Sequence, residues 1–193
     1  MNIIETIKER FKNLESGVEL EEITQMSDNE YRIKLRSVEA KERKKYVLSE
    51  MSKQYFKNVH PYLVEVMSAA ITDSPYDFRI TAGARTVKEQ NALYQIGRTR
   101  AGNTVTNADG YKNKSNHQIK ADGYGYAVDI FICGKYDENG NYVKYNTKEG
   151  YDFKKLKAVA DHIKSIAKTK GYKVEWGGDW KAGWGGPHFE LKL

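Results

Sequence analysis

The chain has 193 residues, of which 39% are hydrophobic and 30% are charged, a balance that fits one domain with an extension and excludes wholesale disorder. Its single cysteine, Cys133, excludes an internal disulfide or a multi-cysteine metal site, and without a long apolar run we expect no insertion into a membrane. The formal net charge of +6 favours anionic partners such as nucleic acid, anionic lipid or an anionic cell-wall polymer, without choosing among them.

The first 55 residues are predicted to form a helical extension, residues 1–55, that is separate from the rest of the chain. Near its start, apolar side chains recur at helical spacing: Ile3, Ile4, Ile7, Phe11 and Leu14. A longer helix is predicted from about Val38 to Ile71, with Pro61 as the place where it could break. The basic run from Lys41 to Lys45 is typical of a solvated helix face. No helix-turn-helix, zinc-finger or RNA-binding signature accompanies it, so we expect no nucleic-acid partner.

Residues 56–193 alternate strand patterns with helical patterns, which indicates an α+β domain. The predicted elements follow in chain order: strand 78–81, helix 86–97, strand 126–133, a hairpin turning at Asn139-Gly140, helix 151–170, strand 172–176 and strand 188–193. A glycine- and asparagine-rich stretch, residues 98–125, separates the first helix from the second strand. A stretch of this length without secondary structure is typical of a functional loop or of a disordered segment.

The start of the chain lacks the features of a secretory signal peptide. Met1 to Leu14 include an acidic residue, Glu5, and contain no apolar core of the required length. We therefore expect synthesis in a host cytoplasm, and action outside that compartment would need a separate means of release.

Three side chains with useful chemistry stand in unusual surroundings. His117 follows the long polar stretch, His188 opens the last predicted strand, and Asp129 lies inside an apolar strand, where a carboxylate is costly to bury without a cation or hydrogen-bond donors. Two imidazoles and one carboxylate form the ligand set of a catalytic zinc site that keeps one position open for water. Taken singly, each residue also has a plain structural explanation, as a solvent-facing loop histidine or as a carboxylate paired with a buried arginine.

The segment SNHQIKADGYGYAVD resembles the Ser-x-His…Gly-x-Ala-x-Asp motif of the zinc D-Ala-D-Ala carboxypeptidase family, which includes phage L-alanyl-D-glutamate endolysins. The matching residues are Ser115, His117, Gly125, Ala127 and Asp129. Three further segments resemble the family in the same order: TAGARTVKEQNALYQIGRT, VTNADGYKNKSNH, and WGGDW followed by PHFEL. The resemblance covers roughly residues 60–193 and implies the family's fold, a small antiparallel sheet with flanking helices.

The resemblance implies that His117, Asp129 and His188 are the zinc ligands. A zinc ion there would act as a Lewis acid and lower the pKa of its bound water to about 7. Arg85 corresponds to the family's arginine that supports the substrate carbonyl, or the oxyanion as charge develops. A salt bridge that fixes the start of the helix is the alternative role for Arg85.

The resemblance also implies candidate substrate contacts. Ser115 corresponds to a hydroxyl that contacts the substrate or supports a ligand, and Gln90 and Trp184 are further candidates for substrate binding. Together with Trp176 and Trp180, Trp184 either lines the substrate groove or packs around the last strand.

One departure from the family lies between the first two ligands. The family's first histidine and its aspartate lie closer together than the twelve-residue step from His117 to Asp129. The extra residues, within Gln118–Tyr124, must loop out if both ligands are to reach one ion. Gly123 and Gly125 make such a loop sterically easy.

A second departure concerns the general base. The family places Asp or Glu three residues before the last histidine, and here that position is Gly185. General acid–base help is worth about 10²–10⁴-fold in rate, so glycine predicts a nearly disabled enzyme. Three explanations stay open: an inactivated form of an active parent, a displaced carboxylate such as Asp179 or Glu190, or a natural zinc protein without turnover.

The sequence thus predicts a zinc metallopeptidase of the phage endolysin type that cuts the L-Ala–D-Glu bond in the stem peptides of bacterial peptidoglycan. A D-Ala-D-Ala carboxypeptidase and a non-catalytic, wall-binding zinc protein are the alternatives. We expect a monomer with Zn²⁺ as its cofactor and peptidoglycan as its partner. Release by a holin would bring the protein to the wall, to which its positive charge would attract it less strongly at high salt.

Overall fold

The computed structural model describes residues 6, 18–27, 30–37, 46–180 and 185–193. The chain divides into two compact units, Met1–Arg43 and Lys44–Leu193. The sequence placed the boundary later, after residue 55. The structure assigns residues near Leu48 to the second unit because Leu48 is buried in its core and Tyr46 packs against that core.

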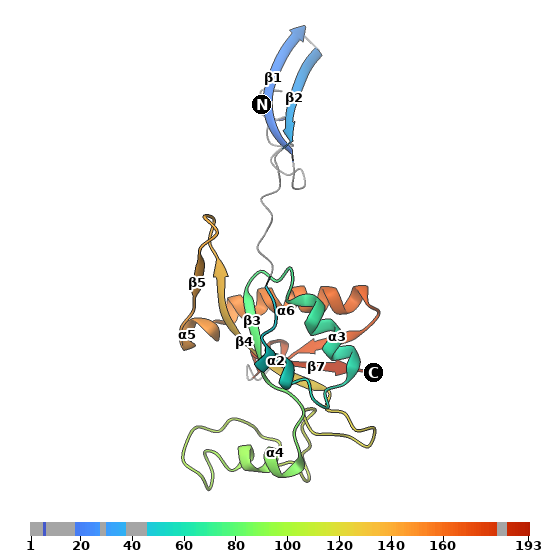
Figure 1. Cartoon of the computed structure of the whole chain (residues 1–193), viewed down its shortest axis with the longest axis vertical. Coiled ribbons are helices and arrows are strands. Elements are labelled where there is room, and N and C mark those ends of the chain that lie inside the picture. Colours follow the sequence, from blue (N-terminus) through green and yellow to red (C-terminus); the bar gives the residue numbers. More distant parts are fainter. Residues whose placement is uncertain (1–5, 7–17, 28–29, 38–45, 181–184) are drawn as a thin grey trace. The chain divides into compact units, whose positions relative to one another are not determined.

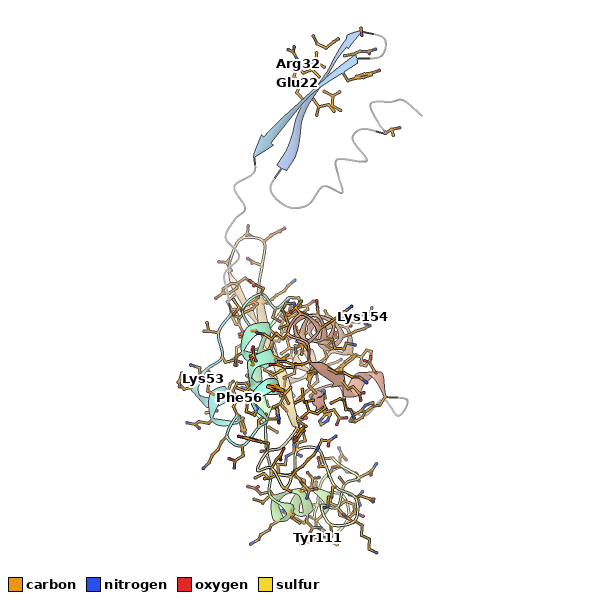
Figure 2. The ribbon with its side chains drawn as sticks, turned by 90° about the vertical axis from the view of Figure 1, so that its right-hand side faces the viewer. Glu22, Arg32, Lys53, Phe56, Tyr111 and Lys154 are labelled. Atoms are coloured by element: carbon orange, nitrogen blue, oxygen red, sulfur yellow. The ribbon has the colours of Figure 1, made fainter. Side chains whose placement is uncertain are left out.

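The first unit contains a β-hairpin (Figure 1), so the predicted helical extension is wrong for residues 18–37. Strand β1 (Val18–Ser27) pairs antiparallel with β2 (Glu30–Ser37). Apolar and polar residues alternate along β2, which is the period of a half-exposed strand and not of a helix, whereas the alternation in β1 is interrupted at Glu21-Glu22, beside a register shift. Figure 2 labels Glu22 and Arg32 on the two strands. The helix predicted from Ile3 to Leu14 lies outside the described residues, except for Thr6.

The helix predicted from Val38 to Ile71 is divided before Pro61, the place where the sequence allowed a break. Its first residues, 38–45, lie outside the described part, and the remainder contains two short helices, α2 (Glu50–Gln54) and α3 (Pro61–Ala70). The break precedes Pro61: Asn58 has a φ of 59° and Val59 forms a β-bridge with Gly125. Pro61 instead begins α3, as its fixed φ and missing N–H permit at a first helical position.

The second unit contains a small antiparallel sheet with flanking helices, which confirms the predicted fold class. Four strands follow the order β3-β4-β7-β6, with neighbours antiparallel, and β5 pairs with the far end of β4. The bounds of the strands are β3 Asp77–Ala82, β4 Ala127–Tyr136, β5 Tyr142–Lys144, β6 Lys173–Trp176 and β7 His188–Lys192. The short elements α5 (Thr147–Gly150) and η1 (Gly177–Asp179) complete the connections.

One layer of helices covers the sheet and closes the core. The amphipathic helix α6 (Phe153–Thr169) packs against α3 and β6, and α3 also contacts β7. The most deeply buried side chains come from both layers and include Leu63, Met67, Ile130, Ile132, Ile163, Trp176 and Phe189. None of the helices among the described residues is long and apolar enough to cross a membrane.

Helix α4 (Val87–Tyr94) and the loops around it form a lobe at one end of the sheet (Figure 1). A capping box starts the helix: the Thr86 side chain accepts from the Glu89 amide, and the Glu89 carboxylate accepts from the Thr86 amide. The polar stretch that follows is ordered by side chains, since Gln90 and Asn91 donate to the carbonyls of Ala108 and Asp109. This lobe carries the segment that leads to His117.

Candidate metal centre

Two of the three predicted ligands face each other across neighbouring strands. Asp129 on β4 is the direct partner of His188 on β7 in the antiparallel register. Side chains of such partners lie on the same face of a sheet, close enough to touch. His188 Nδ1 lies 3.1 Å from Asp129 Oδ1. The pairing of the two strands is therefore what brings together residues that lie far apart in the sequence.

The third predicted ligand, His117, is carried by a loop that backbone hydrogen bonds fix on both sides. The Arg85 amide donates to the His117 carbonyl at 2.8 Å, and the Tyr126 amide donates to the carbonyl of Asn116 at 2.6 Å. His117 itself is buried, with 2% of its surface exposed. The extra residues that follow it close on themselves, because the Lys120 amide donates to the Tyr124 carbonyl at 2.9 Å. The insertion therefore loops out and leaves the ligands adjacent.

The three ligand atoms form a nearly equilateral triangle. His117 Nε2 lies 3.1 Å from His188 Nδ1 and 3.3 Å from Asp129 Oδ1, and the third side is the 3.1 Å contact between His188 and Asp129. Tetrahedral zinc with ligand bonds of about 2.0–2.2 Å requires ligand atoms roughly 3.3 Å apart. The donor set and its spacing therefore fit a zinc-sized ion with one further position open.

Each histidine is oriented by an acceptor at its other ring nitrogen. His117 Nδ1 lies 2.7 Å from the carbonyl oxygen of Gly83, and His188 Nε2 lies 3.2 Å from Glu190 Oε2. An acceptor at that nitrogen keeps the proton there and leaves the facing nitrogen free as a ligand. His117 is thus set to bind through Nε2 and His188 through Nδ1.

The charges around the site favour a cation at its centre. Burial raises the pKa of Asp129, but its interactions with His117 and His188 outweigh burial and hold this pKa far below its usual range. Burial lowers the pKa of His188, while hydrogen bonds to Asp129 and Glu190 raise it to about 9. The carboxylates thus stabilise a positive charge at His188 Nδ1, and a metal ion that binds there would displace that proton.

Arg85 and Gln90 support the ligand Asp129 from the α4 side. Arg85 Nη2 donates to Asp129 Oδ2 at 2.9 Å, and Arg85 Nη1 donates to Gln90 Oε1 at 3.1 Å. Both roles considered for Arg85 remain compatible with this geometry, since the salt bridge leaves its side chain 16% exposed. Gln90 is fully buried. Its side chain accepts a hydrogen bond from Arg85, and a contact of Gln90 with the substrate stays a prediction.

Three positions bear on the general base: residue 185, where the family carries it, and the two alternative carboxylates, Asp179 and Glu190. Gly185 lies beside Gly177, where an added Cβ would be 3.0 Å from the Gly177 Cα. Asp179 lies on η1 and pairs with Lys164 of α6 at 2.9 Å. Glu190 contacts His188 on the side away from the ligand triangle. Among the described residues, neither alternative carboxylate is directed at the open coordination position.

The remaining candidates are the residues predicted to contact the substrate, and all but one lie in the described part of the chain. Ser115 Oγ accepts from the His117 amide at 3.3 Å, which places this hydroxyl beside the ligand loop. Trp176 is a core residue, 1% exposed, whose indole donates to the Gly186 carbonyl. Trp180 is 41% exposed, and its ring centroid lies 5.2 Å from that of His188. Trp184 lies outside the described residues.

Sequence reasoning missed the groups that hold the ligands in place. The Gly83 carbonyl orients His117, and Asn116 donates from Nδ2 to Glu190 Oε2 at 2.7 Å. A backbone carbonyl has no sequence signal. Asn116 and Glu190 each lie within two positions of a predicted histidine ligand, and this closeness in sequence was the one signal that could have identified them.

Comparison with known proteins matches most of the second unit to one family of peptidases. The family model of the phage L-alanyl-D-glutamate peptidases matches residues 44–191. The peptidoglycan L-alanyl-D-glutamate endopeptidase CwlK of Bacillus subtilis (strain 168) is 34% identical over 140 residues, which is 69% of this chain and 74% of that protein. The crystal structure of the Serratia marcescens L-Ala D-Glu endopeptidase ChiX superposes with a TM-score of 0.53 at 24% identity, covering 76% of this chain and 90% of that one. At that identity the structural likeness supports the fold alone.

Proposed function

Because the chain belongs to the phage L-alanyl-D-glutamate peptidase family, we propose that it holds one zinc ion and acts on the L-Ala–D-Glu bond of peptidoglycan stem peptides. The observation that carries the proposal is the triangle of His117 Nε2, Asp129 Oδ1 and His188 Nδ1, with sides of 3.1–3.3 Å. Two imidazoles, one carboxylate and one open position are the arrangement of catalytic zinc sites. When bound, the metal would supply Lewis acidity and lower the pKa of a water molecule that it binds.

Arg85 is a cation that lies beside the proposed ligands. One of its nitrogens is bound to Asp129 and another to Gln90, so its guanidinium group is held in one orientation while part of it faces solvent. A fixed cation of this kind stabilises negative charge that develops on a carbonyl oxygen. We assign Arg85 to the carbonyl of the bond that is cleaved.

Ser115 and Trp180 are the proposed walls of the substrate groove. The Ser115 hydroxyl lies next to the loop of His117, and the exposed ring of Trp180 packs on His188. An aromatic ring beside the ligands can contact the substrate peptide and limit the access of water to it.

Gly185 sets the rate that this chain can reach. The family's carboxylate would stand there, and neither Asp179 nor Glu190 is directed at the open position among the residues that the structure describes. We propose that the chain binds the metal and the wall peptide but cleaves slowly. Its catalytic rate should be about 10²–10⁴-fold lower than that of a version that carries the base. A Cβ at residue 185 would lie 3.0–3.1 Å from backbone atoms of Gly177, and the φ of 158° at this position strains any side chain, so the test needs Gly185→Ala as a control for that strain.

Digestion of purified peptidoglycan tests this proposal. The zinc-loaded chain and its Gly185→Asp and Gly185→Ala variants are incubated with sacculi, and the released peptides are identified by mass spectrometry. We expect Gly185→Asp to release stem peptides with a new D-Glu amino terminus at least 100-fold faster than Gly185→Ala. Alanine is the matched control, since it adds the same Cβ without a carboxylate.

Other products would select a different function. Release of terminal D-Ala alone would indicate a D-Ala-D-Ala carboxypeptidase. Zinc binding and wall binding without cleavage by any variant would favour the non-catalytic wall-binding protein, for which the glycine at position 185 is the supporting observation.

We propose peptidoglycan as the partner and a monomer as the working form. The net charge of +6 favours attraction to an anionic wall, an attraction that should weaken as salt rises. We assign catalysis to the unit from Lys44 onward, which the family model matches, and an accessory role such as wall targeting to the unit before it. Synthesis in a host cytoplasm, followed by holin-dependent release to the wall, remains the proposed route.

A further inference from the structure

A buried carboxylate lies directly behind the proposed metal centre. Glu190 on β7 is 5% exposed and is surrounded by three donors. Its Oε2 lies 3.2 Å from His188 Nε2 and 2.7 Å from Asn116 Nδ2, and its Oε1 lies 2.6 Å from Lys192 Nζ. Burying a charge at such a place is costly unless each contact offsets part of the lost hydration. An apolar side chain would fill this space without that cost, so the buried carboxylate indicates a role beyond packing.

The contacts of Glu190 join two separate ligand-bearing segments. His188 lies on the same strand as Glu190, whereas Asn116 belongs to the loop that carries His117. The same oxygen, Oε2, receives both the imidazole of His188 and the amide of Asn116. One carboxylate therefore links the strand of one histidine to the loop of the other.

The position of Glu190 excludes it from the open side of the triangle. It contacts the ring nitrogen of His188 that points away from Asp129 and His117, while Nδ1 of the same ring faces them. A group on that side cannot reach a water molecule at the open coordination position. Its influence on chemistry must pass through the histidine.

We propose that Glu190 is a positioning residue for the zinc site, which fixes the ring of His188 and ties it to the loop of His117 through Asn116. This inference rests on the proposed function, because it concerns how the same ligands are held. An acceptor at the remote nitrogen fixes the tautomer and the ring orientation and makes the ligating nitrogen more basic. Loss of such a partner typically lowers metal affinity by about 10–100-fold.

The test compares two glutamates on neighbouring strands in the full chain. Glu190→Gln keeps the shape of the side chain but removes its charge and one of its acceptors. Glu175→Gln is the matched control, since Glu175 is the register partner of Glu190 and also contacts Lys192, at 3.2 Å, but lies on β6. Zinc affinity is measured by competition with a chromophoric chelator, and the cobalt(II)-substituted proteins are compared by their visible absorption bands.

We expect Glu190→Gln to weaken zinc binding by about 10–100-fold and to shift the cobalt bands, with Glu175→Gln unchanged in both. An Asn116→Ala variant, which keeps Glu190 and removes only its hydrogen bond to the loop, should weaken zinc binding to a lesser extent. Thermal unfolding without metal separates the proposed role from a structural one. A lowered melting temperature with unchanged zinc affinity and unchanged cobalt bands would overturn the inference.

The outcomes also separate this inference from the proposed function. If the unsubstituted chain and Glu175→Gln bind zinc tightly and Glu190→Gln binds it equally well, the inference fails and the metal site stands. If the unsubstituted chain binds no zinc, the proposed function fails and the inference fails with it. Should Glu190→Gln not fold, the Asn116→Ala variant decides: unchanged zinc affinity in that protein contradicts the link between loop and strand.

Discussion

Each proposed metal ligand in this site is paired with a second group that orients its side chain. Each proposed ligand has a partner that fixes it: the Gly83 carbonyl for His117, Glu190 for His188, and the Arg85 guanidinium for Asp129. Arg85 itself depends on Gln90, a side chain with no exposed surface. The chain of support therefore extends from the ligands into the core of the α4 lobe.

Gln90→Leu tests how much that buried support contributes to folding. Leucine fills nearly the same volume but leaves the Ala108 carbonyl without its donor and Arg85 without one acceptor. We expect the free energy of unfolding, measured in urea, to fall by about 1–3 kcal/mol, the usual cost of an unsatisfied buried polar group.

Gln95→Leu is the control for this substitution. Gln95 follows the last turn of α4, and its side chain forms hydrogen bonds with Asn91 and Thr99, whereas the Arg85 side chain forms its own with Gln90 and Asp129. Equal losses of stability in the two variants would show that the Gln90 contacts add nothing beyond those of an ordinary helix-end glutamine.

At the level of elements, the sequence predicted the sheet and missed the beginning of the chain. The apolar run of β4 and the periodicity of α6 depend on local burial, and both were predicted within a few residues. The break before Pro61 was anticipated from the proline, but its extent was not, because the residues ahead of Pro61 are held by the bridge between Val59 and Gly125. The hairpin formed by β1 and β2 was missed, although the alternation along β2 carried the signal.

The candidate site could be predicted as a set of ligands but not as an arrangement. The motif resemblance supplied His117, Asp129 and His188, and the structure brings their ligand atoms within 3.3 Å of one another. Which nitrogen of each imidazole faces the centre depends on Gly83 and Glu190, and those contacts arise only from the folded chain. The same is true of Gln90, whose buried position no local pattern indicates.

At the scale of the whole molecule, the division into two units predicts that the second one folds alone. The buried hydrophobic cluster of the described residues lies entirely within Lys44–Leu193, and the family model matches the same region. A chain truncated to residues 44–193 should keep its cooperative thermal unfolding and its zinc affinity. If the first unit targets the wall, the truncated chain should also pellet less efficiently with sacculi.

Circular dichroism melts and a co-sedimentation assay check this prediction against the full chain. Loss of cooperative unfolding on truncation would contradict the assignment of separable units. Unchanged sedimentation with sacculi would remove the targeting role and leave the hairpin unit without an assigned function.

The central claim is that one zinc ion is held by His117, Asp129 and His188, and an anomalous diffraction measurement at the zinc edge tests it most directly. Crystals of the full chain grown with one equivalent of zinc should show a single anomalous peak within about 2.0–2.2 Å of His117 Nε2, Asp129 Oδ1 and His188 Nδ1. Zinc bound at another site, or a peak bonded to Glu190 in place of these three atoms, would contradict the account.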